Sequence, residues 1–187
     1  IRIVPWARGY RMILSQGNTV LFSMARTKER EDKFKWVGDL RELSYSFYSL
    51  KSAEANGIHS VNDAKRYTVV AVRNSFEAQS LIRQGFVVGE NLVLAINYQQ
   101  AWKMLLYGRV DYTYANAFIG DNIYKSLGLE VDPFYRQSFV VEILSLYIAA
   151  SLTTDDPIVD TLRRILIDIK NDGTFYQINS VQPPLLF

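Results

Sequence analysis

The sequence predicts an α/β fold, in which strands of parallel sheets alternate with covering helices, and three observations predict it. Short apolar, β-branched runs alternate along the chain with helical stripes of about ten residues. A helix, a glycine and a strand follow one another in the same order in two separate segments. Two extended segments, Ser44 to Lys51 and Phe139 to Ala149, bracket the middle of the chain. These features indicate two α/β lobes joined by two strands, which is the geometry of a hinge.

The composition argues against several classes of function. Of the 187 residues, 49% are hydrophobic and 13% aromatic, which is enough for a substantial core. The 21 Lys and Arg residues nearly balance the 19 Asp and Glu residues, and a net charge of +2 does not suit binding to a phosphate backbone. No apolar run approaches the roughly 18 to 20 residues that cross a bilayer. We therefore expect no nucleic-acid partner and no membrane insertion.

Metal and cofactor sites are not expected either. The chain has no cysteine, which excludes disulfides, thiolate metal sites and cysteine nucleophiles. His59 is the one histidine, so it cannot build a histidine metal site or find a cysteine ligand. We expect His59 to lie in a surface loop and the chain to need no cofactor.

The first elements are a strand, a helix and a second strand. Ile1 to Val4 is predicted to be a strand, and Pro5 can open a helix that Gly17 ends. A strand is expected from Thr19 to Met24. The predicted apolar face of the helix consists of Trp6, Tyr10, Ile13 and Leu14.

The middle of the chain continues the alternation. Tyr67 to Val72 is predicted to be a buried strand, and Asn74 or Ser75 can cap the helix that follows. Glu77 is placed to complete a capping box behind Asn74, and Gly85 can end this helix.

A further strand, helix and strand follow. The strands are predicted at Leu92 to Ile96 and at Val110 to Ala115, with Gly108 ending the helix between them. The segments MILSQGNTVLFSMA and MLLYGRVDYTYANA show the same order of elements, although such a unit also recurs by chance. The helix carries an apolar stripe of Tyr98, Ala101, Trp102, Leu105 and Leu106.

The last predicted helix is the most strongly patterned. Asp156 can cap it, Pro157 can open it, and Gly173 lies near its end. Its predicted apolar face consists of Ile158, Leu162, Ile165, Leu166 and Ile169.

Six motifs follow one another over nearly the whole chain: PWARGYRMI, LFSMARTKERED, FKWVGDL, AVRNSFEAQSLI, AWKMLLYGRVDY and NDGTFYQI. In this order they resemble bacterial extracellular solute-binding proteins of family 3, the polar amino-acid ABC-transporter type. The resemblance implies a type II periplasmic-binding-protein-like fold of two α/β lobes joined by two crossover strands. Residues 1–50 and 144–187 would form lobe one and residues 51–143 lobe two. It also implies that the first βα unit of lobe one, roughly 30 residues, is missing from this chain.

The resemblance also implies a function. The chain would be a periplasmic protein that captures a small carboxylate-bearing ligand, an amino acid or a related organic acid, between its lobes. An ABC-transporter permease would be its partner, and it would not be an enzyme. Two alternatives stay open: a ligand-sensing module of a membrane receptor, and a cyclohexadienyl-dehydratase-like enzyme. Such an enzyme needs an acid or base, for which Glu77 and Glu142 are the residues to consider.

In lobe one, the resemblance implies a ligand carboxylate held by Arg30, whose planar donors match a carboxylate bidentately. An exposed cation paired with Glu29 or Glu31 is the alternative reading of Arg30. Ser23 would contact the ligand through its hydroxyl or backbone. Arg26 is a further candidate, although a solvated surface position also explains it.

In lobe two, the resemblance points to the start of a helix at Asn74, Ser75 and Phe76, where free backbone amides can bind an anion. Ser75 matches a small hydroxyl residue of the family, and a simple N-cap explains it as well. Asn74 replaces the usual glycine, and asparagine also tolerates a positive φ.

Three further residues complete the candidate ligand site. Asn116 stands where amino-acid binders of the family have an aspartate for the ligand's α-ammonium group, and a neutral amide supplies no such charge. Its alternative role is to cap a helix from Ala117 to Leu127. Trp6 could stack on a ligand or pack in the core, and Tyr147 could face the ligand or pack in its sheet.

Overall fold

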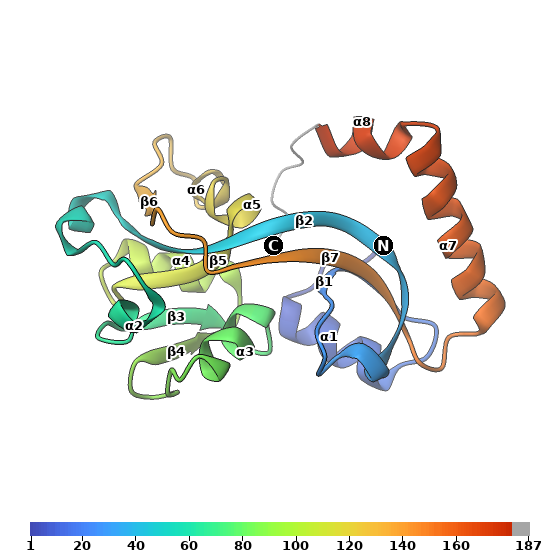
Figure 1. The fold of residues 1–187 in the computed structure, drawn as a ribbon, viewed down its shortest axis with the longest axis horizontal. Helices are drawn as coiled ribbons and strands as arrows, with labels where there is room; N and C mark the ends of the chain where they lie inside the picture. The colour runs from blue at the N-terminus through green and yellow to red at the C-terminus, as the bar shows by residue number, and fades with distance from the viewer. Residues whose placement is uncertain (181–187) are drawn as a thin grey trace. The chain divides into compact units, whose positions relative to one another are not determined.

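The structure is a computed structural model that describes residues 1–180, without the side chains of residues 54–56, 179 and 180. Its elements alternate along the chain and fall into two compact units (Figure 1). Unit 1 contains Ile1–Arg8 and Leu43–Ile143, and unit 2 contains Gly9–Glu42 and the residues from Leu144 onward. Each unit is described by itself below.

Two strands pass from one unit into the other. Strand β2 (Phe34–Leu50) and strand β7 (Glu142–Ser151) each contain a boundary between the units. Both segments were predicted to be extended. β2 begins at Phe34 rather than at Ser44. Residues 34–43, for which no element was predicted, form the first part of this strand. The predicted lobe boundaries at residues 50 and 143 stay a prediction.

Unit 1 is built on three parallel strands: β3 (Val69–Val72), β4 (Leu92–Ala95) and β5 (Tyr112–Asn116). β3 pairs in parallel with β4 on one side and with β5 on the other. β5 in turn pairs antiparallel with β2, and β2 also pairs with β6 (Phe134–Arg136). The strand order β2-β5-β3-β4 therefore places the predicted buried strand β3, all of whose residues are buried, near the middle of the sheet.

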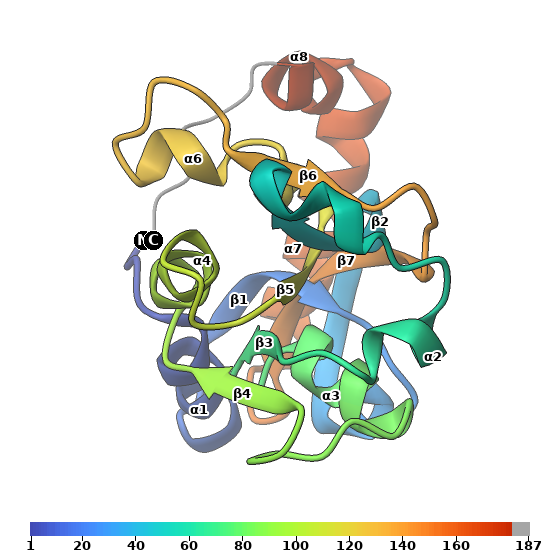
Figure 2. The same cartoon turned by 90° about the vertical axis from the view of Figure 1, so that its left-hand side faces the viewer.

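Helices cover both faces of this sheet. α3 (Phe76–Arg83) and α4 (Tyr98–Leu106) pack against β3 and lie on opposite sides of it (Figure 2). This follows from right-handed crossovers, because the chain moves from β3 out to β4 and then back to β5. Trp102 lies fully buried on the α4 side, where it makes edge contacts with Tyr48 and Phe134. The remaining short helices of unit 1 are η2 (Lys51–Asn56), α2 (Val61–Ala64), α5 (Ala117–Gly120) and α6 (Ile123–Ser126).

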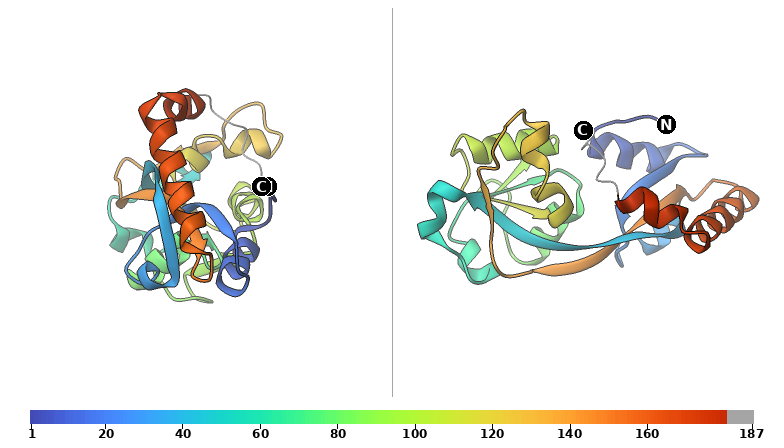
Figure 3. Two further views of the ribbon diagram at one scale, coloured as in Figure 1. Left: turned by 90° about the vertical axis from the view of Figure 1, so that its right-hand side faces the viewer. Right: turned by 90° about the horizontal axis from the view of Figure 1, so that it is seen from above.

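Unit 2 contains β1 (Val20–Ala25), which pairs antiparallel with β7, and the first part of β2. The 3-10 helix η1 (Glu31–Lys33) leads into β2, and α1 (Trp6–Ser15) precedes β1. α7 (Asp156–Asn171) and α8 (Thr174–Ser180) follow β7, as Figure 3 shows. The core between α7 and the strands consists of Val37, Ile148, Ala150, Val159 and Leu166.

The alternation of elements is confirmed, and three details of the predictions are wrong. Ile1 to Val4 forms no strand, because no strand among residues 1–180 pairs with it, and Ile1 and Ile3 are exposed. In α1, Leu14 is exposed and does not belong to the apolar face. The N-cap of α7 is Asp155, so Asp156 and Pro157 occupy the first two helical positions.

The buried face of α7 also differs from the prediction. Ile158 and Ile165 were predicted to be buried and are exposed. Leu166 is buried as predicted, and Val159, which was not on the predicted face, is buried as well. Both pairs are seven residues apart, so periodicity alone does not say which pair faces the sheet. None of the helices in the described part of the chain combines the length and apolar character that a bilayer crossing requires.

Candidate functional site

β1 and the loop after it carry three of the predicted ligand-binding residues, Ser23, Arg26 and Arg30. The pairing of β1 with β7 shifts between Leu21 and Met24, so one additional residue of β1 is accommodated there. Ser23 takes up this shift with a left-handed φ of 62°, and its side chain is exposed. A bulge of this kind redirects the strand, and the chain then enters the Arg26–Arg30 turn.

Arg30 is buried in unit 2 with a relative exposure of 1%. Its Nη1 donates to the carbonyl oxygen of Ala25 at 3.1 Å, and its guanidinium lies 5.1 Å from the centre of the Tyr10 ring. A guanidinium is rarely buried unless polar groups or rings compensate for lost hydration. The alternative that Arg30 is an exposed, solvated cation is therefore wrong.

Arg26 is the arginine of this loop that pairs with Glu31. Its Nε donates to Glu31 Oε2 at 2.8 Å, and its Nη2 donates to Oε1, which makes the pair bidentate. The bond from Arg26 lowers the pKa of Glu31, and the same bond raises the pKa of Arg26. The guanidinium also lies 5.2 Å from the centre of the Trp36 ring and 5.3 Å from that of Tyr147.

A row of four aromatic rings connects the surroundings of the two arginines. Tyr10 touches Phe34, Phe34 touches Trp36 and Trp36 touches Tyr147, with ring centres 5.9, 5.8 and 5.7 Å apart in edge contacts. Of this row only Tyr147 was predicted as a site residue. Phe34 and Trp36 are two residues apart on β2 and so share one face, which was the available signal.

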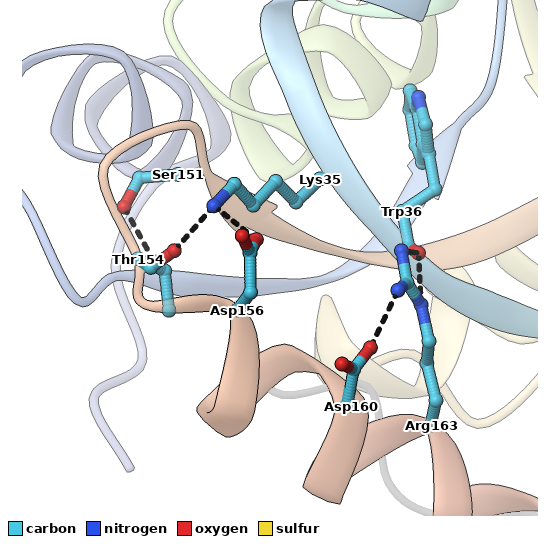
Figure 4. A network of polar contacts seen from close by, with 7 residues as sticks. All are labelled: Lys35, Trp36, Ser151, Thr154, Asp156, Asp160 and Arg163. Atoms are coloured by element: carbon cyan, nitrogen blue, oxygen red, sulfur yellow. Dashed lines mark hydrogen bonds and ion pairs between the residues drawn. The ribbon is translucent and has the colours of Figure 1, made fainter.

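The backbone beneath Trp36 is held by α7, as Figure 4 shows. Nε and Nη2 of Arg163 both donate to the Trp36 carbonyl, at 3.1 and 2.8 Å. The neighbouring Lys35 donates through Nζ to the carbonyl of Thr154 and to the carboxylate of Asp156, at 2.7 and 2.6 Å. The indole N–H of Trp36 donates to the Glu31 carbonyl at 3.0 Å. Trp36 is thus fixed at both its backbone and its ring.

Unit 1 contributes a different kind of site. At the carboxyl ends of its three parallel strands, a side chain caps the helix that follows each strand. Ligands of open parallel sheets bind at such edges, because helix amino termini gather there. The three capping bonds run from Ala78 N–H to Ser75 Oγ at 3.2 Å, from Gln100 N–H to Asn97 Oδ1 at 2.8 Å, and from Ile119 N–H to Asn116 Oδ1 at 3.0 Å.

The start of α3 differs from the predicted capping box. Ser75 is the N-cap, so Glu77 lies one position too early to bond back to the N-cap backbone. Instead the Glu77 carboxylate is buried and accepts a hydrogen bond from the Tyr98 hydroxyl at 3.1 Å. Asn74 has a positive φ of 60°, as predicted for a glycine-like position. Its carbonyl accepts the indole N–H of Trp6 at 2.9 Å.

Three other predicted residues of unit 1 pack in the core or cap a helix. Phe76 is buried and makes an edge contact with Tyr45, with ring centres 5.0 Å apart. Asn116 caps only the short helix α5, because the predicted helix from Ala117 to Leu127 is divided into α5 and α6. Trp6 packs beside the α4 core cluster of unit 1.

A second carboxylate network, around the half-buried Glu142, lies in unit 1. Glu142 accepts hydrogen bonds from the hydroxyls of Ser80 at 2.9 Å and Tyr114 at 3.4 Å. Burial, followed by the charge of Glu142, raises the pKa of Tyr114 well above its usual range. Glu77 and Glu142 are thus held by hydroxyl donors. Within residues 1–180, no three His, Cys, Asp or Glu residues gather as metal ligands, and His59 is exposed as predicted.

Comparison with known proteins identifies the fold. No protein-family profile and no curated protein matches the chain. A solved mutant of ArgBP from T. maritima is similar with a TM-score of 0.81 and 14% identity, over 94% of this chain and 73% of that one. A histidine kinase sensor domain with similarity to periplasmic binding proteins gives 0.84 and 16%, over 96% and 75%. The GluR0 ligand-binding core from Nostoc punctiforme, in complex with L-glutamate, gives 0.67 and 17%, over 83% and 68%. This chain therefore has the mixed α/β fold of periplasmic-binding-protein-like proteins.

Proposed function

We propose that this chain binds a small molecule that carries a carboxylate, and that it does so without making or breaking a bond. The observation that supports this proposal most is the likeness of 94 to 96% of the chain to ArgBP and to a sensor domain. The solved relatives include an arginine-bound and a glutamate-bound form. Both of these bound molecules are amino acids, and each contains a carboxylate.

In unit 2, Arg30 is the residue we propose for the ligand carboxylate. Its guanidinium is shielded from water, and a charge interaction is stronger there than at the surface. The Tyr10 ring and the Ala25 carbonyl fix the plane of the donor fork, which reduces the entropy lost on binding. Ser23, exposed on the bulge of β1, would add a hydroxyl or backbone contact.

In unit 1, the polar groups favour a ligand oxygen over an ammonium group. Asn116 Oδ1 already accepts the Ile119 N–H with one of its two lone pairs, so its Nδ2 donors are the larger part of what Asn116 can offer a ligand. Ser75 and the backbone from Asn74 to Phe76 would contribute at the start of α3. The Glu77 carboxylate lies in the first turn of α3 and already interacts with the positive end of the helix dipole. The start of α3 is therefore a weaker candidate than Arg30 for binding the ligand's carboxylate.

We also propose that the chain acts in the periplasm and passes its ligand to an ABC-transporter permease. A ligand-sensing module of a membrane receptor is the second candidate, because a histidine kinase sensor domain is similar over 96% of this chain. The complete coding sequence distinguishes them. A kinase or cyclase domain joined through a membrane-spanning segment supports the sensor, and a free exported protein supports transport.

An enzymatic function has less support. One similar structure is an ancestral amino-acid-binding protein described as a precursor of cyclohexadienyl dehydratase, with a TM-score of 0.69 and 18% identity. Glu77 and Glu142 would be the acids to test here. Incubation with prephenate, followed by absorbance, would show loss of water if this alternative holds.

A ligand screen tests the proposed function. The purified protein is first analysed by native mass spectrometry for a molecule carried through purification. Thermal unfolding is then followed with amino acids and simple organic acids, each compared with its amide. A carboxylate ligand at a concentration of about 100 times its Kd should raise the free energy of unfolding by about 2.7 kcal/mol. This increase corresponds to a rise in Tm of about 5 to 10 °C. If amides raise the Tm as much as the acids do, the carboxylate proposal is wrong.

A further inference from the structure

Arg26 is held by aromatic rings and is also accessible to solvent. Arg30 contacts an aromatic ring as well, but it is buried. The Arg26 guanidinium lies just over 5 Å from the centres of two rings, Trp36 and Tyr147. Its side chain nevertheless keeps 38% of its exposure. Trp36 belongs to β2 and Tyr147 to β7, whereas Arg26 belongs to the loop after β1. The side chain of this loop residue therefore packs on rings whose backbone is held in a sheet.

The rings that hold Arg26 are themselves fixed independently of its ion pair. Arg163 donates twice to the Trp36 carbonyl, and the Trp36 and Tyr147 rings make an edge contact with each other. Each cation–π contact is worth about 0.5 to 1 kcal/mol at an accessible site. The Arg26 guanidinium would therefore keep its position if its carboxylate partner changed.

In this structure Arg26 forms its ion pair with the carboxylate of Glu31, and another carboxylate could replace Glu31 at little cost. Its side chain is 44% exposed, and among the described residues Arg26 is the only group that donates to its carboxylate. Exposed ion pairs of this kind add little stability, because water and salt compete for both partners. The bidentate geometry shows which chemistry the site accepts: a planar carboxylate presented edge-on to the guanidinium.

We propose that Glu31 is an internal stand-in for a second ligand carboxylate, and that the ligand is a dicarboxylate whose second acid group displaces Glu31 from Arg26. This inference rests on the proposed function, in which Arg30 binds the first carboxylate. Arg30 and Arg26 lie against the same aromatic row, Arg30 on Tyr10 and Arg26 on Trp36 and Tyr147. Arg26 would give the selectivity for a second acid group, whereas Glu31, which competes for Arg26, would weaken dicarboxylate binding without affecting a ligand that binds only Arg30.

The test measures affinity for pairs of ligands that differ only in the second acid group. Succinate, glutarate, adipate and L-glutamate are each compared with the mono-amide, for instance succinamate and L-glutamine, by calorimetry on the purified protein. The wild type should prefer one or more of the dicarboxylates by about tenfold. Arg26→Gln should reduce this ratio to about one.

Glu31→Gln gives the opposite and more specific result. Removing the competitor should tighten dicarboxylate binding by about two- to fivefold, since an exposed ion pair contributes about that much. Glu130→Gln is the matched control, because it removes one exposed negative charge in unit 1 and should leave both affinities unchanged.

Three outcomes overturn the inference. If the wild type binds mono-amides as tightly as dicarboxylates, or if Glu31→Gln does not tighten dicarboxylate binding beyond the Glu130→Gln control, Arg26 has no second carboxylate to bind. In both cases the proposed function stands, provided that Arg30→Lys still weakens the binding of all these ligands. If no carboxylate binds at all, both the proposed function and this inference fail.

Discussion

At the scale of single residues, the two arginines of the loop after β1 show how local geometry decides a role. Arg26 and Arg30 are four residues apart, yet one is accessible and the other is 1% exposed. The turn from Lys28 to Arg30 directs the second side chain back over Tyr10, while the first remains beside Glu31. Because Arg30 is buried, replacing its side chain should cost stability. Because Arg26 is exposed, its ion pair with Glu31 adds little stability, and another carboxylate can replace Glu31.

Lys35 and Asp156 give a prediction of pH dependence at this scale. The hydrogen bond from Lys35 is the first cause that lowers the pKa of Asp156 below its ordinary value of 3.8. A lowered pKa in the folded state means that the stabilisation is present above pH 3.8 and is lost as the pH falls through the lowered value. Lys35→Met should therefore raise the pKa of Asp156 toward 3.8.

Carboxyl NMR titration of the wild type and of Lys35→Met measures this change. Asp63 serves as the internal control, because its pKa is lowered by Ser60 and His59 rather than by a lysine. A pKa of Asp156 that stays unchanged in Lys35→Met would show that the ion pair does not exist in solution.

At the scale of elements, α7 shows what hydrophobic periodicity predicts and what it leaves open. The period of the helix was predicted correctly, and so was its approximate end. The choice of face was wrong for Ile158 and Ile165, because their neighbours Val159 and Leu166 repeat with the same spacing. The strands decide the choice: Leu166 lies against Gly38 of β2, where an added Cβ would come within 2.6 Å of its Cδ2.

This difference predicts unequal effects of two neighbouring truncations. Leu166→Ala should lower the free energy of unfolding by about 2 to 5 kcal/mol, because it leaves a cavity beside β2. Ile165→Ala, at a position 50% exposed, should lower it by about 0.5 kcal/mol or less. Urea unfolding at neutral pH measures both, and equal losses would mean that α7 does not pack on the strands through Leu166.

At the scale of the whole molecule, the alternation of strands and helices was enough to predict the α/β fold. Given the strand order β5-β3-β4, right-handed crossovers then place α3 and α4 on opposite faces of the sheet. Ile1 to Val4 failed as a strand, because a strand needs a partner and none of the described residues supplies one. Pairing is a property of the assembled sheet, and a local apolar run does not reveal it.

The candidate site was predictable only in part, for a similar reason. Ser75 follows a buried strand and Asn116 is the last residue of another, so their capping roles could be predicted from local sequence. The aromatic row could not, because Tyr10, Phe34 and Tyr147 come from α1, β2 and β7. Neither could the choice of Arg26 over Arg30 as the partner of Glu31, because Arg30 is adjacent to Glu31 in sequence and Arg26 is five residues away.

The central claim is that Arg30 binds the carboxylate of a small ligand, and calorimetry of Arg30→Lys with the acid that best stabilises the wild type tests it most directly. Lysine keeps the positive charge but loses the planar donor fork. Thermal unfolding and circular dichroism establish that the variant is folded, and Arg164→Met, at an exposed position of α7, is the control. We expect affinity to fall by about tenfold or more in Arg30→Lys and to stay unchanged in the control. A folded Arg30→Lys variant that binds the acid as tightly as the wild type would contradict the account.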